Sequence, residues 1–210
     1  MMRRRILLII TLIIAASLSS EARLPDSWFF RRFNMGVEWG YTQCLIRTWD
    51  YNIISEEGYR IYDEGGEWML HPNASVSAHI GFLLNDYLVL ALYGGYAGVG
   101  TGNRLLPVQL RLSWFLDSVD EDGSFLFCQG GPAIHLHNQE MRPAWLFATG
   151  YGFRMRLNSD CNLDVSLGMK YLNDHPLLPN PEGPGYVPMH NIRKNNAGYY
   201  VMDLSVGFNF

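Results

Sequence analysis

Histidines are the side chains in this sequence best placed to do chemistry. His135 and His137 lie two residues apart, and on a strand this spacing puts both imidazoles on one face. Imidazole nitrogens bind zinc and haem iron, so this pair, with His71 as a third candidate, raises the hypothesis of a metal or haem site. The alternative is that all three are ordinary residues of loops and strand ends, because a sequence alone does not bring distant loop positions together.

The elements that would position these residues are strands with a period of two. Near the start of the chain, Met35, Val37, Trp39 and Tyr41 share one face, and small or polar residues share the other. This alternation is typical of a strand with one face in an apolar medium. Eight such stretches are predicted, at about 33–42, 73–84, 87–99, 106–116, 124–137, 144–157, 162–171 and 199–210. The third is apolar on both faces, which leaves its orientation open.

The strand lengths and connections predict a membrane barrel. Tilted strands of about 9–11 residues cross a bilayer, and only a closed barrel leaves no sheet edge unsatisfied in lipid. Short connections alternate with longer ones, the longest at about 47–72 and 172–198, as in barrels with short periplasmic turns and long external loops. We therefore predict an all-β, eight-stranded, antiparallel, up-and-down transmembrane β-barrel. The alternative is a soluble β-sandwich or a lipocalin-like barrel, whose apolar stripes would face inward.

The N-terminal residues predict export. Residues 1–22 contain three arginines, an apolar run too short for a membrane-spanning helix, and then small residues, which is the order of a secretory signal peptide cleaved near Ala22. The alternative is an uncleaved N-terminal anchor. Residues 23–210 would then form one barrel domain. With a net charge of −4 for the whole chain and no basic block, the composition excludes nucleic acid as a partner.

These features together resemble the small eight-stranded outer-membrane β-barrel families of Gram-negative bacteria, in particular the barrels abundant in Bacteroidetes. The resemblance rests on the leader, the eight stripes, the segment 152–157 and the C-terminal residues 206–210, and it covers nearly all of the mature chain. It implies an outer-membrane location, contact with outer-membrane lipids, and recognition of Phe208 and Phe210 by the barrel-assembly machinery. It is a likeness of fold, so it implies no particular activity and no cofactor.

Apolar stripes that face lipid would turn the opposite faces into the lumen. Opposite charges buried there are expected to pair, and a barrel of eight strands leaves just enough room for side chains. We therefore predict a structural ion-pair core that fills the lumen, with a gated proton or ion path as the alternative. Its predicted members are Glu38, Arg111, Arg154, Arg156, Asp164, Lys170 and Asp203.

An enzyme that modifies lipid A or phospholipids is a second hypothesis for the stretch around His135. Asn138 and Glu140 add an amide and a carboxylate nearby. A nucleophile activated by a base must lie within hydrogen-bond reach of that base, but Ser124 is expected at the opposite end of the same strand. No serine follows the histidine at the spacing of a lipid A deacylase, so we assign no catalytic residue.

The two long connections favour a role in surface recognition. The second holds half of the ten prolines, which stiffen a loop. The first mixes aromatic with acidic residues, a composition suited to contact with a protein or glycan: Trp49, Asp50, Tyr51, Glu56, Glu57, Tyr59, Tyr62, Asp63, Glu64, Glu67 and Trp68. The alternative is that these loops only shield the barrel mouth. We interpret the chain as a non-enzymatic barrel that supports the envelope and displays recognition loops, ahead of a lipid-modifying enzyme and a metal or haem binder.

Overall fold

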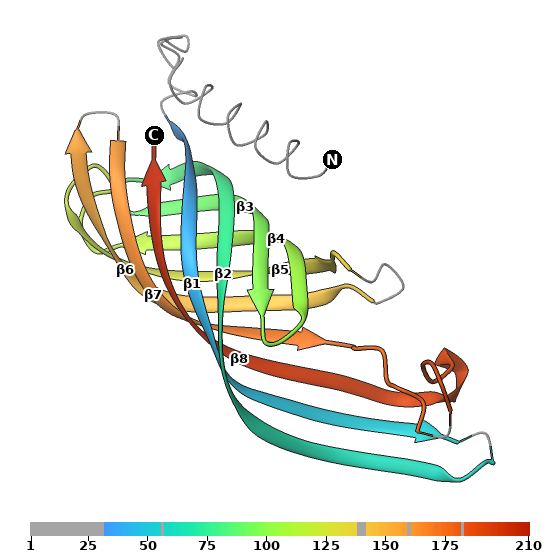
Figure 1. The fold of residues 1–210 in the computed structure, drawn as a ribbon. Helices are drawn as coiled ribbons and strands as arrows, with labels where there is room; N and C mark the ends of the chain where they lie inside the picture. The colour runs from blue at the N-terminus through green and yellow to red at the C-terminus, as the bar shows by residue number, and fades with distance from the viewer. Residues whose placement is uncertain (1–31, 56, 138–141, 159–160, 182) are drawn as a thin grey trace, which may run out of the picture. The chain divides into compact units, whose positions relative to one another are not determined.

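The computed structural model describes residues 32–55, 57–137, 142–158, 161–181 and 183–210. Its eight antiparallel strands are hydrogen-bonded in chain order and close into a barrel (Figure 1), which confirms the predicted fold class. The strands are β1 (Phe33–Ile54), β2 (Arg60–Asn85), β3 (Leu88–Val99), β4 (Asn103–Phe115), β5 (Gly123–His135), β6 (Ala144–Asn158), β7 (Cys161–Asp174) and β8 (Ile192–Asn209). In these ranges no helix has the length and apolarity of a membrane span. The predicted leader, residues 1–22, lies outside them.

The barrel closes where the last strand pairs with the first. In the β1–β8 register, Val37 lies opposite Phe208 and Tyr41 lies opposite Leu204. Met35 and Phe210 exchange two backbone hydrogen bonds, with N···O distances of 3.2 and 2.8 Å. The sheet therefore has no free edge along the barrel wall, which is the condition for a sheet in lipid.

The two faces of the wall are inverted relative to a soluble barrel. Every strand points large apolar side chains outward, among them Trp39, Ile80, Leu92, Leu110, Leu126, Tyr151, Leu167 and Leu204. The third strand, whose orientation the sequence left open, turns Leu90 and Leu92 outward and Ala91 and Tyr93 inward. The soluble alternative is therefore wrong, because the apolar stripes lie on the outside.

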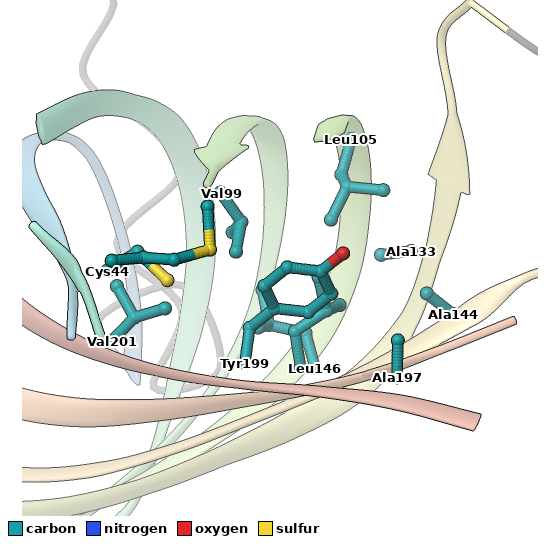
Figure 2. Close-up of a cluster of buried hydrophobic side chains, with 11 residues drawn as sticks. Cys44, Val99, Leu105, Ala133, Ala144, Leu146, Ala197, Tyr199 and Val201 are labelled. Carbon is teal, nitrogen blue, oxygen red and sulfur yellow. The ribbon is translucent and has the colours of Figure 1, made fainter. Parts of the chain in front are cut away.

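Inside, two apolar layers enclose a polar one. Along β4 the inward residues include Leu105 near its start, then Gln109 and Arg111, and finally Phe115, all buried. The end that carries the short β2–β3, β4–β5 and β6–β7 turns, here the turn end, is filled by Val89, Phe115, Val119, Phe125, Phe127 and Ala148. At the opposite, loop end, a larger cluster gathers inside the strands (Figure 2): Cys44, Met69, Val99, Leu105, Ala133, Ala144, Leu146, Leu172, Ala197, Tyr199 and Val201.

Three strands continue past the loop end. β2 pairs with β3 from Ser75 to Asn85, so its residues 60–74 run beyond β3, while β1 stays paired with β8 up to Ile53 and Ile192 (Figure 1). We call residues 45–54, 60–74 and 192–196 the β extension. The predicted loop at 47–72 is therefore wrong in form: only residues 55–59 connect two strands. The sequence obscured this hairpin because a strand outside the membrane needs no apolar face.

The β7–β8 connection is also shorter than predicted. It spans residues 175–191 instead of about 172–198 and ends in a short 3-10 turn, η2 (Met189–Asn191). Its middle folds back on itself, since the Val187 amide donates to the Leu178 carbonyl oxygen at 2.9 Å. Leu178 and Val187 then pack against Ile53 of β1, which fixes this connection to the β extension.

A matched pair of substitutions on β4 tests the assignment of its faces. Leu105→Ala should destabilise the barrel by about 2–5 kcal/mol, because it leaves a cavity in a sealed layer. Leu110→Ala should cost clearly less, because Leu110 points outward and lipid chains can fill the vacated space. Urea unfolding in lipid vesicles measures both. A larger loss for Leu110→Ala would contradict the assignment.

Candidate functional site

The polar layer of the lumen is centred on Arg111 of β4. Its guanidinium binds the Glu38 carboxylate of β1 at two points, with Nη1–Oε2 and Nη2–Oε1 distances of 2.7 and 3.2 Å. The side chains are only 5% and 12% exposed. Two parallel charge-assisted hydrogen bonds are the strong arrangement for such a pair, so β1 and β4 are held together across the lumen.

Arg111 has further partners that the sequence analysis did not single out. It donates to the Tyr93 hydroxyl at 2.8 Å and to Gln129 Oε1 at 2.7 Å. Its guanidinium also lies 4.2 Å from the Tyr93 ring centroid and 4.4 Å from that of Phe127. Gln109 and Gln129 occupy inward positions in the alternation of their strands. This pattern could have predicted that their amide groups lie in the lumen. The partners satisfy a charge that would be costly to bury alone.

Two further ion pairs join neighbouring strands. Arg154 of β6 donates to Asp164 of β7 from Nε to Oδ1 and from Nη2 to Oδ2, both at 2.7 Å. Lys170 Nζ of β7 lies 2.7 Å from Asp203 Oδ1 of β8. The structure thus pairs six of the seven charged residues predicted for the lumen.

Arg156 is the exception, and its predicted place in the lumen is wrong. Its side chain is exposed at the turn end, where Nη1 donates to the Asp120 carbonyl oxygen at 3.1 Å and its backbone amide donates to Asp122 Oδ1 at 2.6 Å. The physical reason is that β6 continues beyond β5, whose register with it ends at Gly123 and Arg154. A side chain on the inward face of β6 at that position therefore lies beyond the barrel interior.

A histidine ties the final strand to this network. His79 Nε2 of β2 lies 2.9 Å from Asn209 Oδ1, and Asn209 Nδ2 donates to Asp164 Oδ2 at 2.9 Å. The His79 ring also stacks on Tyr93 with a centroid distance of 4.5 Å. A lumen void lined in part by Glu38, Tyr93 and Lys170 measures about 20 Å³, which is room for about one water molecule.

The structure separates the three histidines proposed as metal or haem ligands. His135 is buried at the loop end with Nε2 2.9 Å from Asp174 Oδ1, whereas His137 is exposed in a bend and His71 is exposed on β2. The expectation that His135 and His137 share a strand face is wrong, because β5 ends at His135. In the described ranges no three His, Cys, Asp or Glu side chains converge as they would around a metal ion.

The residues weighed for lipid modification are also not assembled. Ser124 lies near the start of β5, where its hydroxyl is hydrogen-bonded to the Tyr151 hydroxyl, and His135 lies at the other end of the same strand. Asn138 and Glu140 fall outside the described residues. A serine and a base must touch for nucleophilic activation, so this pair does not form such a site.

The β extension forms a second candidate site, an open pocket of about 340 Å³ that we call the acidic groove. Trp49 and Tyr51 of β1 face it from one strand, and Asp63 and Glu67 of β2 face it from the next. Its other lining residues are Arg47, Ile53, Ile61, Pro176, Leu177, Leu178, Pro179, Pro181, Asn195, Asn196 and Ala197. Such a mixture of aromatic rings, apolar walls and few polar groups is usual for ligand pockets.

Hydrogen bonds and close packing fix the polar groups of the acidic groove. Trp49 Nε1 donates to Asp63 Oδ2 at 3.1 Å, and Arg47 Nη1 donates to Glu67 Oε1 at 3.3 Å. A Cβ atom added at Gly65 would lie 2.4 Å from Cζ2 of Trp49, so only glycine lets this indole lie flat on β2. The aromatic face is therefore preorganised by the sheet.

A β-bulge in β1 decides which side chains enter the groove. The β1–β8 register shifts between Cys44 and Ile46, after which Trp49 lies opposite Ala197 and Tyr51 opposite Asn195. Burial raises the pKa of Tyr51, and the neighbouring Asp63 carboxylate raises it further. The phenol therefore stays protonated at neutral pH, with its hydrogen directed to the Asp63 carboxylate.

The remaining aromatic residues of the predicted loop lie elsewhere. Trp68, 76% exposed, and Tyr62 alternate along β2 with the groove residues Asp63 and Glu67, so they occupy the opposite face of the β extension. The sequence analysis grouped all of them as one surface, whereas the strand separates them into two.

The closed ring, the apolar outer face and the paired charges inside define an outer-membrane β-barrel. In barrels of this class short turns face the periplasm and longer connections face the exterior, so the external position of the β extension stays a prediction of this rule. The structure places Phe208 opposite Val37 at the closing seam. Recognition of Phe208 and Phe210 by the barrel-assembly machinery stays a prediction, as does the particular likeness to Bacteroidetes barrels.

Comparison with known proteins finds matches among solved structures only. No protein-family model and no curated protein matches the sequence. Similar solved structures include the outer membrane protein OprG from Pseudomonas aeruginosa, 11% identical with a TM-score of 0.48, over 85% of this chain and 96% of that one. The outer membrane protein AlkL is 11% identical with a TM-score of 0.45, over 91% and 96%. The outer membrane protease OmpT from Escherichia coli is 9% identical with a TM-score of 0.44, over 84% and 96%.

A double-mutant cycle tests the Glu38–Arg111 pair. Glu38→Met or Arg111→Met alone should each cost about 3–5 kcal/mol of unfolding free energy, because each leaves a buried charge without its partner. Glu38→Met with Arg111→Met should cost much less than the sum of the two. Urea unfolding in lipid vesicles provides the free energies.

The pair of Lys194 and Asp50, whose side chains are 49% and 30% exposed, is the more accessible control for this cycle. Asp50→Asn should change the unfolding free energy by less than about 1 kcal/mol, because water screens a surface pair. Simple additivity of the two lumen substitutions would show that Glu38 and Arg111 do not interact.

Proposed function

We propose that this protein is a non-enzymatic outer-membrane barrel that supports the envelope and binds an extracellular protein segment or glycan in the acidic groove. The observation that carries the proposal is the β extension itself, in which two hydrogen-bonded strands fix Trp49, Tyr51 and Asp63 around a pocket of about 340 Å³. A rigid aromatic surface with few oriented polar groups loses little conformational freedom when a ligand binds.

The filled lumen supports a role outside the barrel. The bidentate Arg111–Glu38 pair lies between apolar layers that include Phe125 and Leu105. The Arg154–Asp164 pair fills the lumen next to the turn-end layer, where the Arg154 guanidinium lies 4.4 Å from the Phe115 ring centroid. Eight strands give an interior just wide enough for such side chains. Recognition at the loop end needs no passage through this interior.

The chemistry of the acidic groove supports a polar ligand with an apolar or cationic face. Trp49 offers an aromatic surface on which sugar rings or cationic groups can stack. Asp63 and Glu67 offer carboxylate oxygens, and the Tyr51 hydroxyl, whose hydrogen is directed to Asp63, offers an acceptor oxygen. Neutral or basic peptide segments and glycans present the complementary groups.

Whole cells that display the protein should bind selected members of glycan and peptide arrays through the acidic groove. Trp49→Ala should weaken that binding about tenfold or more, since stacked rings and hydrogen bonds to charged groups contribute about 1–3 kcal/mol. Gly65→Val should also weaken that binding, because the valine side chain would displace the Trp49 indole.

Trp68→Ala is the matched control, because it removes the same side chain from the opposite face of the β extension. This variant should bind as the unmodified protein does. The proposal fails if Trp49→Ala leaves array binding unchanged, or if cells with the protein bind no more than cells without it.

A further inference from the structure

A second pocket of the external region, of about 330 Å³, has the opposite charge from the acidic groove. It lies between the start of β6, the start of β8 and the β7–β8 connection. Arg142, Arg193 and Lys194 bring three positive charges to it, and Leu177 and Met189 contribute apolar walls. We call it the basic pocket.

The charges of the basic pocket are only partly neutralised. Lys194 pairs with Asp50 of β1. Within the part of the chain that the structure describes, neither Arg142 nor Arg193 has a hydrogen bond or an ion pair from its side chain, and both residues are exposed. In a chain of net charge −4, this concentration of positive charge favours an anionic ligand.

The position of the basic pocket indicates which anion it meets. Tyr171 and Tyr200, whose ring centroids are 5.1 Å apart, lie on the outer face just below it, as does Trp145. Outward Trp and Tyr side chains mark the boundary between lipid chains and headgroups. Arg142 precedes β6 and lies three residues before Trp145, a separation of at most roughly 10 Å for extended chain.

That displacement corresponds to the depth of lipid headgroups. The headgroup layer of each leaflet is about 5–8 Å thick, since a bilayer is about 40–45 Å thick with headgroups and about 30 Å without them. A strand tilted by about 45° rises roughly 7 Å over 10 Å of its length. Arg142 is therefore placed beside the phosphates of the outer leaflet.

We propose that the basic pocket binds the phosphate-bearing headgroup of a lipid of the outer leaflet. Arg142 and Arg193 supply the planar donor groups that match phosphate oxygens, and Lys194 adds a third charge. Leu177 and Met189 cover the first carbons of the lipid beside the phosphate. The site adjoins the ligand groove proposed above, since both pockets are lined by Pro176, Leu177, Asn195 and Asn196. Its cationic residues Arg142, Arg193 and Lys194 line the basic pocket and not the groove, and they would fix the β extension to the membrane surface.

The test uses the full chain in phosphatidylcholine nanodiscs with added phosphatidic acid, and native mass spectrometry after detergent release. The protein should retain phosphatidic acid about tenfold or more above R142Q/R193Q, because two charge-assisted contacts are lost. R60Q/R104Q is the matched control, since it removes two exposed arginines elsewhere. It should retain phosphatidic acid as the unmodified protein does.

The proposal is overturned by equal retention in R142Q/R193Q and the unmodified protein, or by an equal loss in R60Q/R104Q. If inorganic phosphate displaces phosphatidic acid at equal concentration, the site recognises free phosphate and the lipid assignment is wrong. Heat-modifiable gel migration reports folding of each variant. If R142Q/R193Q does not fold, R193Q alone should still reduce retention several-fold, and unchanged retention by it would equally overturn the proposal.

Discussion

The structure depends on one constraint, which is that a sheet in lipid leaves no backbone group unpaired. β1 meets this constraint by pairing with β8 from Gly36 opposite Asn209 onward. The same pairing does not stop at the barrel end but continues to Ile53 opposite Ile192. One seam therefore both closes the barrel and carries the β extension beyond it.

Closure also determines what the interior must contain. Once the apolar stripes face lipid, the opposite faces bring charges such as Arg111 and Asp203 into a narrow space with little water. Each of these charges has an opposite charge at 2.7 Å, and apolar layers separate them from both ends. A lumen filled in this way leaves little room for a ligand, whereas the acidic groove and the basic pocket both lie beyond the loop end of the barrel.

Much of the barrel wall could be predicted from the sequence, because lipid imposes an alternation that is visible residue by residue. The β extension could not, since its strands lie beyond the lipid-facing wall, where no apolar outer face is required, and the bulge after Cys44 shifts their register. The alternation along each strand was enough to predict which charges point into the lumen, except at Arg156. That prediction failed because β6 continues beyond the end of its pairing with β5. Contacts such as Trp49 with Asp63, or His135 with Asp174, depend on the register between strands. No local pattern encodes them.

The most direct test of this account is disulfide formation between β1 and β8 outside the barrel, in cells that carry the protein with its three native cysteines replaced. Cysteines at Asp50 and Asn196, which lie opposite each other in the register, should crosslink as readily as cysteines at Trp39 and Val206 within the wall. Crosslinking within the wall alone would show that the seam ends at the barrel and that the β extension is an unpaired loop.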